Sequence, residues 1–326
     1  MSTVLEVRGL TIGFAHGASV VTDADWSVDA GKTLAVVGES GSGKSVTAMS
    51  VLRLLPSPPA EYRAGSITFT DPEGGATTEI LRASTRELSR IRGGRIAMIF
   101  QEPMTSLNPV MSIGEQLVET IRVHQECGSR DAALLAATAL ADVGIRDRAG
   151  ARAGAILRAY PHEFSGGMRQ RVMIAMAMAC HPAVLLADEP TTALDVTTQR
   201  QVLDLLDERK RATGMAMVLI SHDLGLVRGR ADEVCVMYRG RVVERGAVAE
   251  VFAGPIHPYT RALVACSPRI DRRPGRLATI DDAMADGSMM KEFEARVGKR
   301  AWWPGGEGAR AALECVSPGR WVAVAG

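Results

Sequence analysis

The segment GESGSGKS at residues 38–45 constrains the fold more than any other feature of the chain. It fits the pattern G-x-x-x-x-G-K-[ST], in which glycines let the backbone turn so tightly that successive N–H groups point at phosphate oxygens. Lys44 is placed to reach the terminal phosphates, and the Ser45 hydroxyl is placed to bind Mg²⁺. The pattern therefore predicts a loop that binds a nucleoside triphosphate with Mg²⁺. The residues predicted to bind it are Gly38, Glu39, Ser40, Gly41, Ser42, Gly43, Lys44, Ser45 and Val46.

The flanks of this loop agree with that interpretation. Residues 33–37 are a short apolar run typical of a buried strand, and residues 45–55 have a helical pattern that stops at Pro56. Such a helix would direct the positive end of its dipole at the phosphates. An ordinary glycine-rich turn between a strand and a helix is disfavoured, because all four fixed positions of the pattern are filled and both flanks are of the right type.

Composition narrows the environments in which the chain works. Its 326 residues carry a formal net charge of +1, so no excess of positive charge favours nucleic acid or anionic lipid as a partner. There is no run of about 18 apolar residues and no secretory pattern at the N-terminus, so any membrane role is expected to come through a partner. The five cysteines are widely spaced and form no C-x-x-C pair, which disfavours a metal site and favours reduced thiols in the cytosol.

Strand and helix patterns alternate along the chain. An antiparallel pattern covers residues 4–28, a helical, Ala-rich pattern covers about 113–179, and a further helix is expected over 196–211. This order predicts an α/β fold with a mainly parallel sheet, an antiparallel β subdomain, a helical insertion and a C-terminal extension. Strands after the phosphate loop are expected at residues 65–69, 95–100, 183–187, 216–220 and 233–237.

A second motif is the apolar run 184–187, which is followed by Asp188 and Glu189. A strand that ends in two acidic residues places both carboxylates at the carboxyl edge of a parallel sheet, where α/β proteins bind ligands. Asp188 is suited to hold Mg²⁺, directly or through water, and Glu189 is suited to orient or deprotonate an attacking water. The pair alone would indicate a solvated strand end, but the phosphate loop upstream favours the catalytic interpretation.

A third motif begins with Ser165, Gly166 and Gly167 and leads into a helical run over residues 170–179. A glycine pair before a helix can present backbone N–H groups to a phosphate. The loop around Lys44 already serves its own nucleotide, and the third motif belongs to the separate helical insertion. We therefore predict that it contacts a nucleotide held by a partner subunit, with a simple helix cap as the alternative.

These motifs together resemble those of the nucleotide-binding subunit of an ABC transporter. Six motifs occur in family order over about residues 4–250. They are Walker A at 38–45, the Q-loop at Gln101, the signature motif at 165–170, Walker B at 184–189, the D-loop at 193–195 and the switch-histidine loop at 221–223.

The resemblance implies a role for each motif. Phe14 resembles the aromatic residue that stacks on adenine, and Gln101 resembles the residue that senses Mg²⁺ and the transport subunit. His222 resembles the residue that contacts the terminal phosphate and holds Glu189 and water in line. The catalytic residues implied are Lys44, Gln101, Glu189 and His222, and the metal ligands implied are Ser45, Gln101 and Asp188. The nucleotide contacts implied outside the phosphate loop are Phe14, Ser165, Gly166, Gly167, Gln170 and Asp195.

Two further segments are similar to the di- and oligopeptide importer branch of this family. One reads QEPMTSLNP at residues 101–109, and the other reads HPYTRAL at residues 257–263. The branch also includes nickel, glutathione and some sugar importers, so the cargo stays open. Many members bind an iron–sulfur cluster through clustered cysteines in the tail, but the tail here offers only Cys266 and Cys315, and we predict no cluster.

After about residue 267, Arg, Gly, Asp and Pro become frequent and few periodic apolar runs appear, which indicates a domain boundary. We predict a nucleotide-binding domain over residues 1–266, with a helical subdomain at about 103–179, and a C-terminal extension over 267–326. Tryptophans at 302, 303 and 321 are expected to hold the extension in place, and residues 289–326 are a candidate dimer contact.

The resemblance also implies partners. These are a second ABC ATPase subunit, two transmembrane permease subunits and an extracytoplasmic substrate-binding protein, with this chain at the cytoplasmic face of the inner membrane and no nucleic acid. Both halves of the site are intact, so a homodimer is possible, but the branch often pairs two different ATPases and we favour a heterodimer. The alternatives are an exporter subunit and a soluble ABC ATPase that acts on nucleic acid or ribosomes, and the near-neutral charge disfavours the latter.

Overall fold

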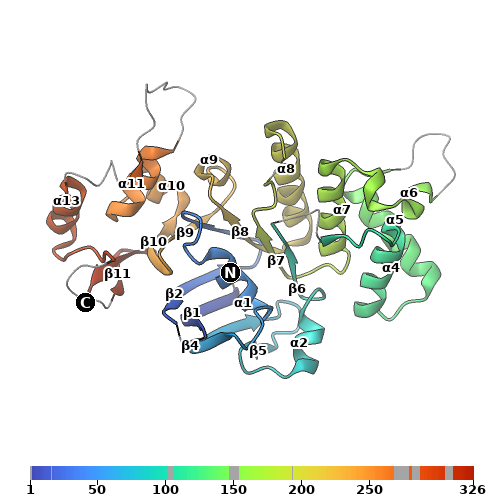
Figure 1. The fold of residues 1–326 in the computed structure, drawn as a ribbon, viewed down its shortest axis with the longest axis horizontal. Coiled ribbons are helices and arrows are strands. Elements are labelled where there is room, and N and C mark those ends of the chain that lie inside the picture. Colours follow the sequence, from blue (N-terminus) through green and yellow to red (C-terminus); the bar gives the residue numbers. More distant parts are fainter. Residues whose placement is uncertain are drawn as a thin grey trace.

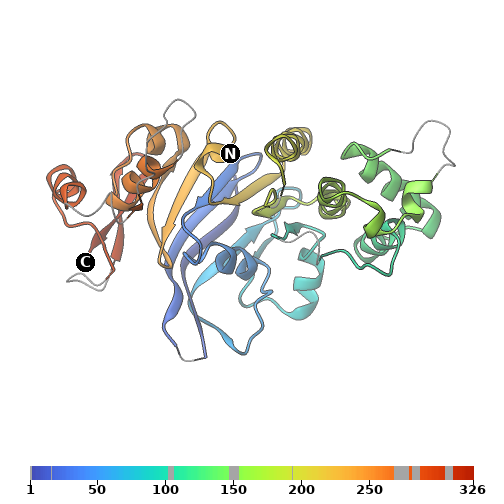
Figure 2. The ribbon, with the colours of Figure 1, turned by 45° about the horizontal axis from the view of Figure 1, so that its top comes forward.

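The computed structural model describes residues 2–15, 17–101, 106–146, 154–192, 194–267, 279–280, 287–304 and 311–326. These residues form two sheets with helices at both ends of the molecule (Figure 1). The helices of residues 113–178 lie at one end and the C-terminal elements lie at the other, as both views show (Figure 1, Figure 2). In this described part of the chain, no helix is long and apolar enough to cross a membrane.

The N-terminal residues form an antiparallel sheet in the order β2-β1-β4-β5. Buried residues alternate with exposed ones along much of β1 and β2, because successive side chains of a strand point to opposite faces. The inward-facing Leu5, Leu10 and Trp26 are at most 1% exposed and join one apolar cluster. This sheet confirms the predicted antiparallel subdomain. Its strands are β1 (Thr3–Phe14), β2 (Ser19–Asp29), β4 (Ala60–Thr70) and β5 (Thr77–Glu79).

The second sheet has the order β11-β12-β10-β9-β3-β8-β7-β6, and its strands from β9 to β6 are parallel. The register sets Val37 beside Ser221, Asp188 beside Ile220, and Ile99 beside Ala187. The carboxyl ends of β3, β6, β7 and β8 therefore meet at one edge, where the predicted site residues follow. The parallel strands are β3 (Thr33–Val37), β6 (Ile96–Ile99), β7 (Val184–Asp188), β8 (Ala216–Ser221) and β9 (Glu233–Tyr238).

Seven further helices are described, of which α1 follows the phosphate loop. Helix α1 is shorter than the predicted range of 45–55, because Arg53 adopts a positive φ of 47° and Arg92 donates hydrogen bonds to the terminal carbonyl oxygens of Leu52 and Arg53. These bonds satisfy acceptors that the end of the helix leaves open, so the chain can turn before Pro56. The helices are α1 (Lys44–Val51), α2 (Thr85–Ile91), α8 (Val196–Thr213), α9 (Leu224–Val227), α10 (Val248–Ala253), α11 (Pro258–Cys266) and α13 (Ser288–Val297).

The helices of the predicted insertion share one apolar cluster with residues of β6, β7, β8 and α8. Ser112 and Glu115 cap the start of α4 reciprocally, so two backbone N–H groups that the helix leaves open are satisfied. Helix α7 begins at Gly166, before the predicted residue 170, because Ser165 caps it. Part of the predicted subdomain, residues 103–105 and 147–153, lies outside the described residues. The elements are α4 (Ile113–His124), α5 (Ser129–Asp142), α6 (Ala155–Arg158), a 3₁₀ turn (Pro161–Glu163) and α7 (Gly166–Met178).

The C-terminal residues extend the central sheet. Strands β11 (Ala311–Ser317) and β12 (Arg320–Ala325) form a hairpin, and β12 pairs antiparallel with β10 (Arg241–Ala247). Arg320 donates a 2.7 Å hydrogen bond to Glu244, and these side chains are 8% and 0% exposed. Trp302 is buried and Trp321 is 40% exposed. The tail is therefore packed through Trp302, Arg320 and sheet pairing.

His257 is a fully buried side chain between this tail and α11. Its Nδ1 atom accepts a hydrogen bond from the Tyr259 backbone N–H, so its Nε2–H donates to the Trp302 carbonyl oxygen at 3.2 Å. In this neutral tautomer, both ring nitrogens of His257 have a hydrogen-bond partner. Burial lowers the pKa of His257 to about 3, because a charged imidazolium would be poorly solvated there.

We expect His257 to make the chain less stable in acid. The unfolded histidine takes up a proton below pH 6.5, whereas the folded one does so only near pH 3. Between these values the free energy of unfolding should fall, as the pH falls, by up to about 1.4 kcal/mol per pH unit from this group. Chemical denaturation at several pH values measures the slope. A His257→Asn variant, which keeps a capping acceptor but does not titrate, should lack this contribution, and identical pH profiles would contradict the assignment.

Candidate nucleotide-binding and catalytic site

The phosphate loop joins β3 to α1, as the sequence predicts. Gly38 and Gly43 have φ values of 151° and 96°, which residues other than glycine rarely adopt. A Cβ atom on Gly38 would lie 2.1 Å from the Met237 carbonyl oxygen, and one on Gly43 would lie 3.1 Å from a methyl of Val21. Only glycine therefore fits where the loop packs against β9 and β2.

Lys44 is buried and its ammonium group turns back over the loop. It donates hydrogen bonds to the carbonyl oxygens of Gly38 and Glu39 at 2.9 and 2.8 Å. Burial lowers the pKa of Lys44, and the carboxylates of Glu189 and Asp188 partly oppose that shift. The ammonium group thus lies at the centre of the loop, close to two acidic side chains, where its positive charge can balance the charge of a phosphate.

Ser45 and Asp188 meet across the site from two separate elements. The Ser45 hydroxyl donates to Asp188 Oδ1 at 3.1 Å. Asp188 is 4% exposed, and burial raises its pKa against the opposing effect of this hydrogen bond. A hydroxyl and a carboxylate are the oxygen donors that Mg²⁺ takes in phosphate sites, alongside oxygens of the phosphates themselves. No group of three His, Cys, Asp or Glu side chains suited to a metal occurs among the residues described.

Glu189 is the meeting point of three other side chains. Gln101 Nε2 donates to its Oε2 atom at 3.0 Å, Thr192 donates to the same oxygen at 2.9 Å, and His222 Nδ1 lies 3.1 Å from Oε1. Burial raises the pKa of Glu189, but the hydrogen bonds from His222 and Thr192 outweigh it and the net shift is downward. Glu189 is therefore a carboxylate at neutral pH.

A cavity of about 150 Å³ opens beside Glu189. It can hold water molecules next to the carboxylate, which is the arrangement that a general base requires. Thr192 belongs to this group although no sequence motif singled it out, and its role follows only from its contact with Glu189. The lining residues are Glu189, Thr191, Thr192, Gln199, Ser221, His222, Asp223 and Leu226.

The signature segment lies on another element. Ser165 and Gly166 are exposed at the start of α7, and the Met168 N–H donates to Ser165 Oγ at 3.4 Å. A Cβ atom on Gly167 would lie 2.9 Å from a methyl of Thr198, so α7 starts close against the start of α8. Where residues are described, no hydrogen bond joins 165–167 to the phosphate loop. The structure thus does not bring these two motifs together within one chain.

The remaining predicted residues occupy several positions. Asp195 is exposed and caps α8 through bonds to Thr198, whereas Gln170 is buried within α7. Phe14 ends β1 and is partly exposed. Ala193 of the predicted D-loop and residues 102–105 of the importer-like segment 101–109 lie outside the described residues.

Comparison with known proteins places these features in a wider context. Residues 21–192 match the ABC transporter family, and residues 243–298 match the C-terminal region of oligopeptide/dipeptide transporters. The glutathione import ATP-binding protein GsiA of Salmonella choleraesuis is 48% identical over 275 residues, which cover 83% of this chain and 43% of GsiA. The chain thus spans less than half the length of that relative.

A second relative is a Brucella melitensis protein whose name describes it provisionally as a peptide import ATP-binding protein. It is 48% identical over 286 residues, which cover 85% of this chain and 83% of that protein. Among solved structures, CbiO1 of Clostridium perfringens, part of an ABC transporter complex, has a TM-score of 0.64 and 25% identity over 78% of this chain and 92% of its own. The ATP-binding cassette MJ0796 has a TM-score of 0.63 at 22% identity over 75% of this chain and 98% of its own, and is similar in fold.

Proposed function

We propose that this chain, which belongs to the ABC transporter family, hydrolyses ATP to power the import of di- or oligopeptides or a related small solute. The observation that carries the proposal is the convergence of four chain segments at one edge of the central sheet. There Ser45 contacts Asp188, and Gln101 and His222 both contact Glu189. The import direction is supported by relatives named for peptide and glutathione import and by the match at residues 243–298.

Binding of the triphosphate uses the loop and its lysine. The amides of residues 38–45 cradle the phosphates while Lys44 balances part of their charge. Ser45 and Asp188 would hold Mg²⁺, with Gln101 close by, and the ion would stabilise the charge that develops on the transferring phosphoryl group. The residues fit this ion because their hydroxyl and carboxylate oxygens already lie 3.1 Å apart.

Hydrolysis requires a water that is oriented and deprotonated. Glu189 is the proposed base, because it is charged at neutral pH and borders a cavity that can admit water. His222 and Gln101 hold its two oxygens in place, and Thr192 adds a third bond that fixes the carboxylate plane. His222 is also the proposed contact to the terminal phosphate, since its side chain is 64% exposed.

The second half of the site is proposed to come from a neighbouring ATPase subunit. Ser165 caps a 13-residue helix that begins with Gly166 and Gly167. Ser165 and Gly166 are exposed at the positive end of the helix dipole. In our proposal they bind the terminal phosphate of the neighbour's ATP, and closure of the pair on two nucleotides moves the transport subunits. A heterodimer is favoured, and a homodimer is possible because both half-sites are present in this chain.

The proposed assembly also includes two permeases and an extracytoplasmic substrate-binding protein, with this chain at the cytoplasmic face of the inner membrane. Affinity purification of the tagged chain from detergent-solubilised membranes tests this assembly. We expect two membrane-embedded permeases and an ATPase partner to co-purify, and ATPase activity to rise when the binding protein carries its solute. Recovery with ribosomes or nucleic acid and without permeases would contradict the proposed function.

A further inference from the structure

The rear of the phosphate loop, on the side away from its phosphate-facing amides, is held by residues that none of the nucleotide motifs includes. The Gly240 N–H donates to the Ser42 carbonyl oxygen at 3.0 Å, and Gly38 packs on the Met237 carbonyl. A third contact comes from α11, where the Tyr259 hydroxyl accepts a 3.1 Å hydrogen bond from the Glu39 N–H. Because Glu39 is the second residue of the loop, this bond fixes the backbone just before the amides that face the phosphates.

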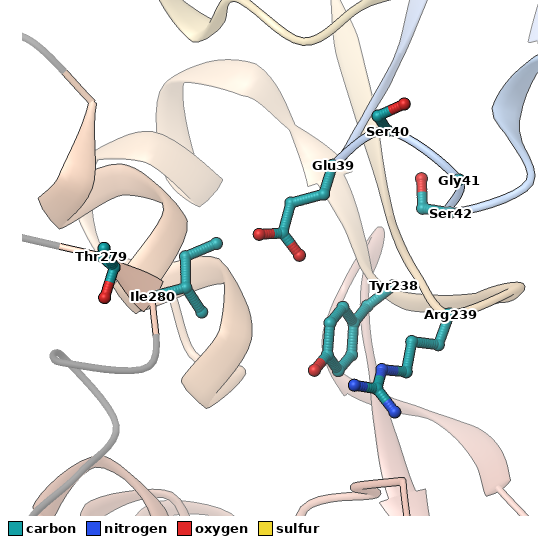
Figure 3. Close-up of a pocket in the computed structure, with 8 residues that line it drawn as sticks. All are labelled: Glu39, Ser40, Gly41, Ser42, Tyr238, Arg239, Thr279 and Ile280. Carbon is teal, nitrogen blue, oxygen red and sulfur yellow. The ribbon is translucent and has the colours of Figure 1, made fainter.

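Tyr259 is itself held rigidly. It is fully buried, and its ring stacks on Tyr238 with centroids 4.1 Å apart. Burial raises the pKa of Tyr259 above its ordinary value, so the hydroxyl is protonated at neutral pH. Next to this stack, a cavity of about 270 Å³ separates Glu39 from Ile280 (Figure 3). Tyr259, whose hydroxyl reaches the loop, therefore lies in the core and does not line the cavity.

The position of Tyr259 depends on the C-terminal tail. His257 caps α11 by accepting the Tyr259 N–H, and the same imidazole donates to Trp302. Glu244 accepts the backbone N–H groups of Ile256 and His257, and Arg320 of β12 pairs with Glu244. The residues of this set are at most 8% exposed, and the hydrogen bonds between them use backbone groups as well as side chains. A continuous set of buried contacts therefore runs from the tail hairpin to the phosphate loop.

We propose that Tyr259 is a positioning residue for nucleotide binding, through which the packed tail sets the shape of the phosphate loop. The hydroxyl engages the Glu39 N–H, so that this amide points into the core and the following amides point outward at the phosphates. Without the hydroxyl, the Glu39 amide loses this acceptor and the loop samples conformations that do not match the phosphates. This inference rests on the proposed function, since it concerns binding of ATP at the same loop.

A Tyr259→Phe variant tests the inference, because phenylalanine keeps the ring stack and removes only the acceptor. We expect the dissociation constant for MgATP and the KM to rise about fivefold or more, as for a lost hydrogen bond, while kcat stays within about twofold of wild type. Hydrogen exchange at the Glu39 amide should quicken. Tyr62→Phe is the matched control, because Tyr62 lies in β4 beside the far end of α1, and it should bind MgATP as the wild type does.

The outcomes separate the inference from the proposed function. MgATP binding by Tyr259→Phe at wild-type affinity, with faster exchange at Glu39, would overturn the inference, because the bond would then be structural only. Absence of MgATP binding by the wild-type chain would instead overturn the proposed function. A measurement on the wild type guards against a variant that does not fold: MgATP should slow hydrogen exchange in α11 as well as in residues 38–45, and unchanged exchange in α11 would also overturn the inference.

Discussion

Replacement of Glu189 by glutamine is expected to slow ATP turnover at least about 100-fold while MgATP remains bound. The amide keeps the size of the side chain and its place between Gln101 and His222, but it cannot accept a proton from water. The loop, Lys44 and Ser45 are untouched, so the loss should appear in kcat and not in the dissociation constant. Phosphate release under saturating ATP, with a separate nucleotide titration, measures both quantities.

Glu208→Gln is the matched control for this variant. It removes a carboxylate from α8 whose side chain is 70% exposed, and it should hydrolyse ATP at the wild-type rate. If Glu189→Gln hydrolysed ATP at a near-normal rate, Glu189 would lose its assigned role. Asp188 would not be the replacement, because its carboxylate is engaged by Ser45 on the metal side of the site.

Replacement of Lys44 by alanine is expected to abolish nucleotide binding, with an affinity loss of at least about 100-fold. Lys44 is a buried cation next to two acidic side chains, and its removal leaves Asp188 and Glu189 to repel the incoming phosphates. The amides of the loop alone do not balance that charge. Equilibrium titration with a fluorescent ATP analogue measures the loss.

Lys32→Ala provides the control for Lys44→Ala. Lys32 lies at the opposite end of β3, where it pairs with Asp232, and its side chain is 39% exposed. Its removal should leave nucleotide affinity unchanged. An unchanged affinity in Lys44→Ala itself would refute the phosphate cradle at residues 38–45.

Much of this site is predictable because its chemistry is carried by short contiguous motifs at strand ends. The pattern at residues 38–45 implies a strand, a turn and a helix in that order, and Asp188 and Glu189 follow an apolar run typical of a buried strand. Parallel pairing of β3, β7 and β8 then brings these ends together. The contact between Ser45 and Asp188 thus follows from local patterns and general sheet geometry.

Other features of the site and the tail carry no recognisable pattern in the sequence. Thr192 carries no motif of its own, and its bond to Glu189 exists only because the turn after β7 folds back. The bond from Glu39 to Tyr259 joins residues 220 positions apart. Strand β11 was not predicted, because its sequence has no regular alternation of apolar and polar residues. It forms a strand by pairing with β12. The division at residue 266 stays a prediction.

The most direct test of the account is a structure of the assembled transporter that contains the Glu189→Gln variant and MgATP. We expect Lys44 to contact the phosphates of the nucleotide in its own subunit, and Ser165 to lie within hydrogen-bond distance of the terminal phosphate held by the neighbouring ATPase subunit. A nucleotide-bound assembly in which residues 165–167 face bulk solvent would contradict it.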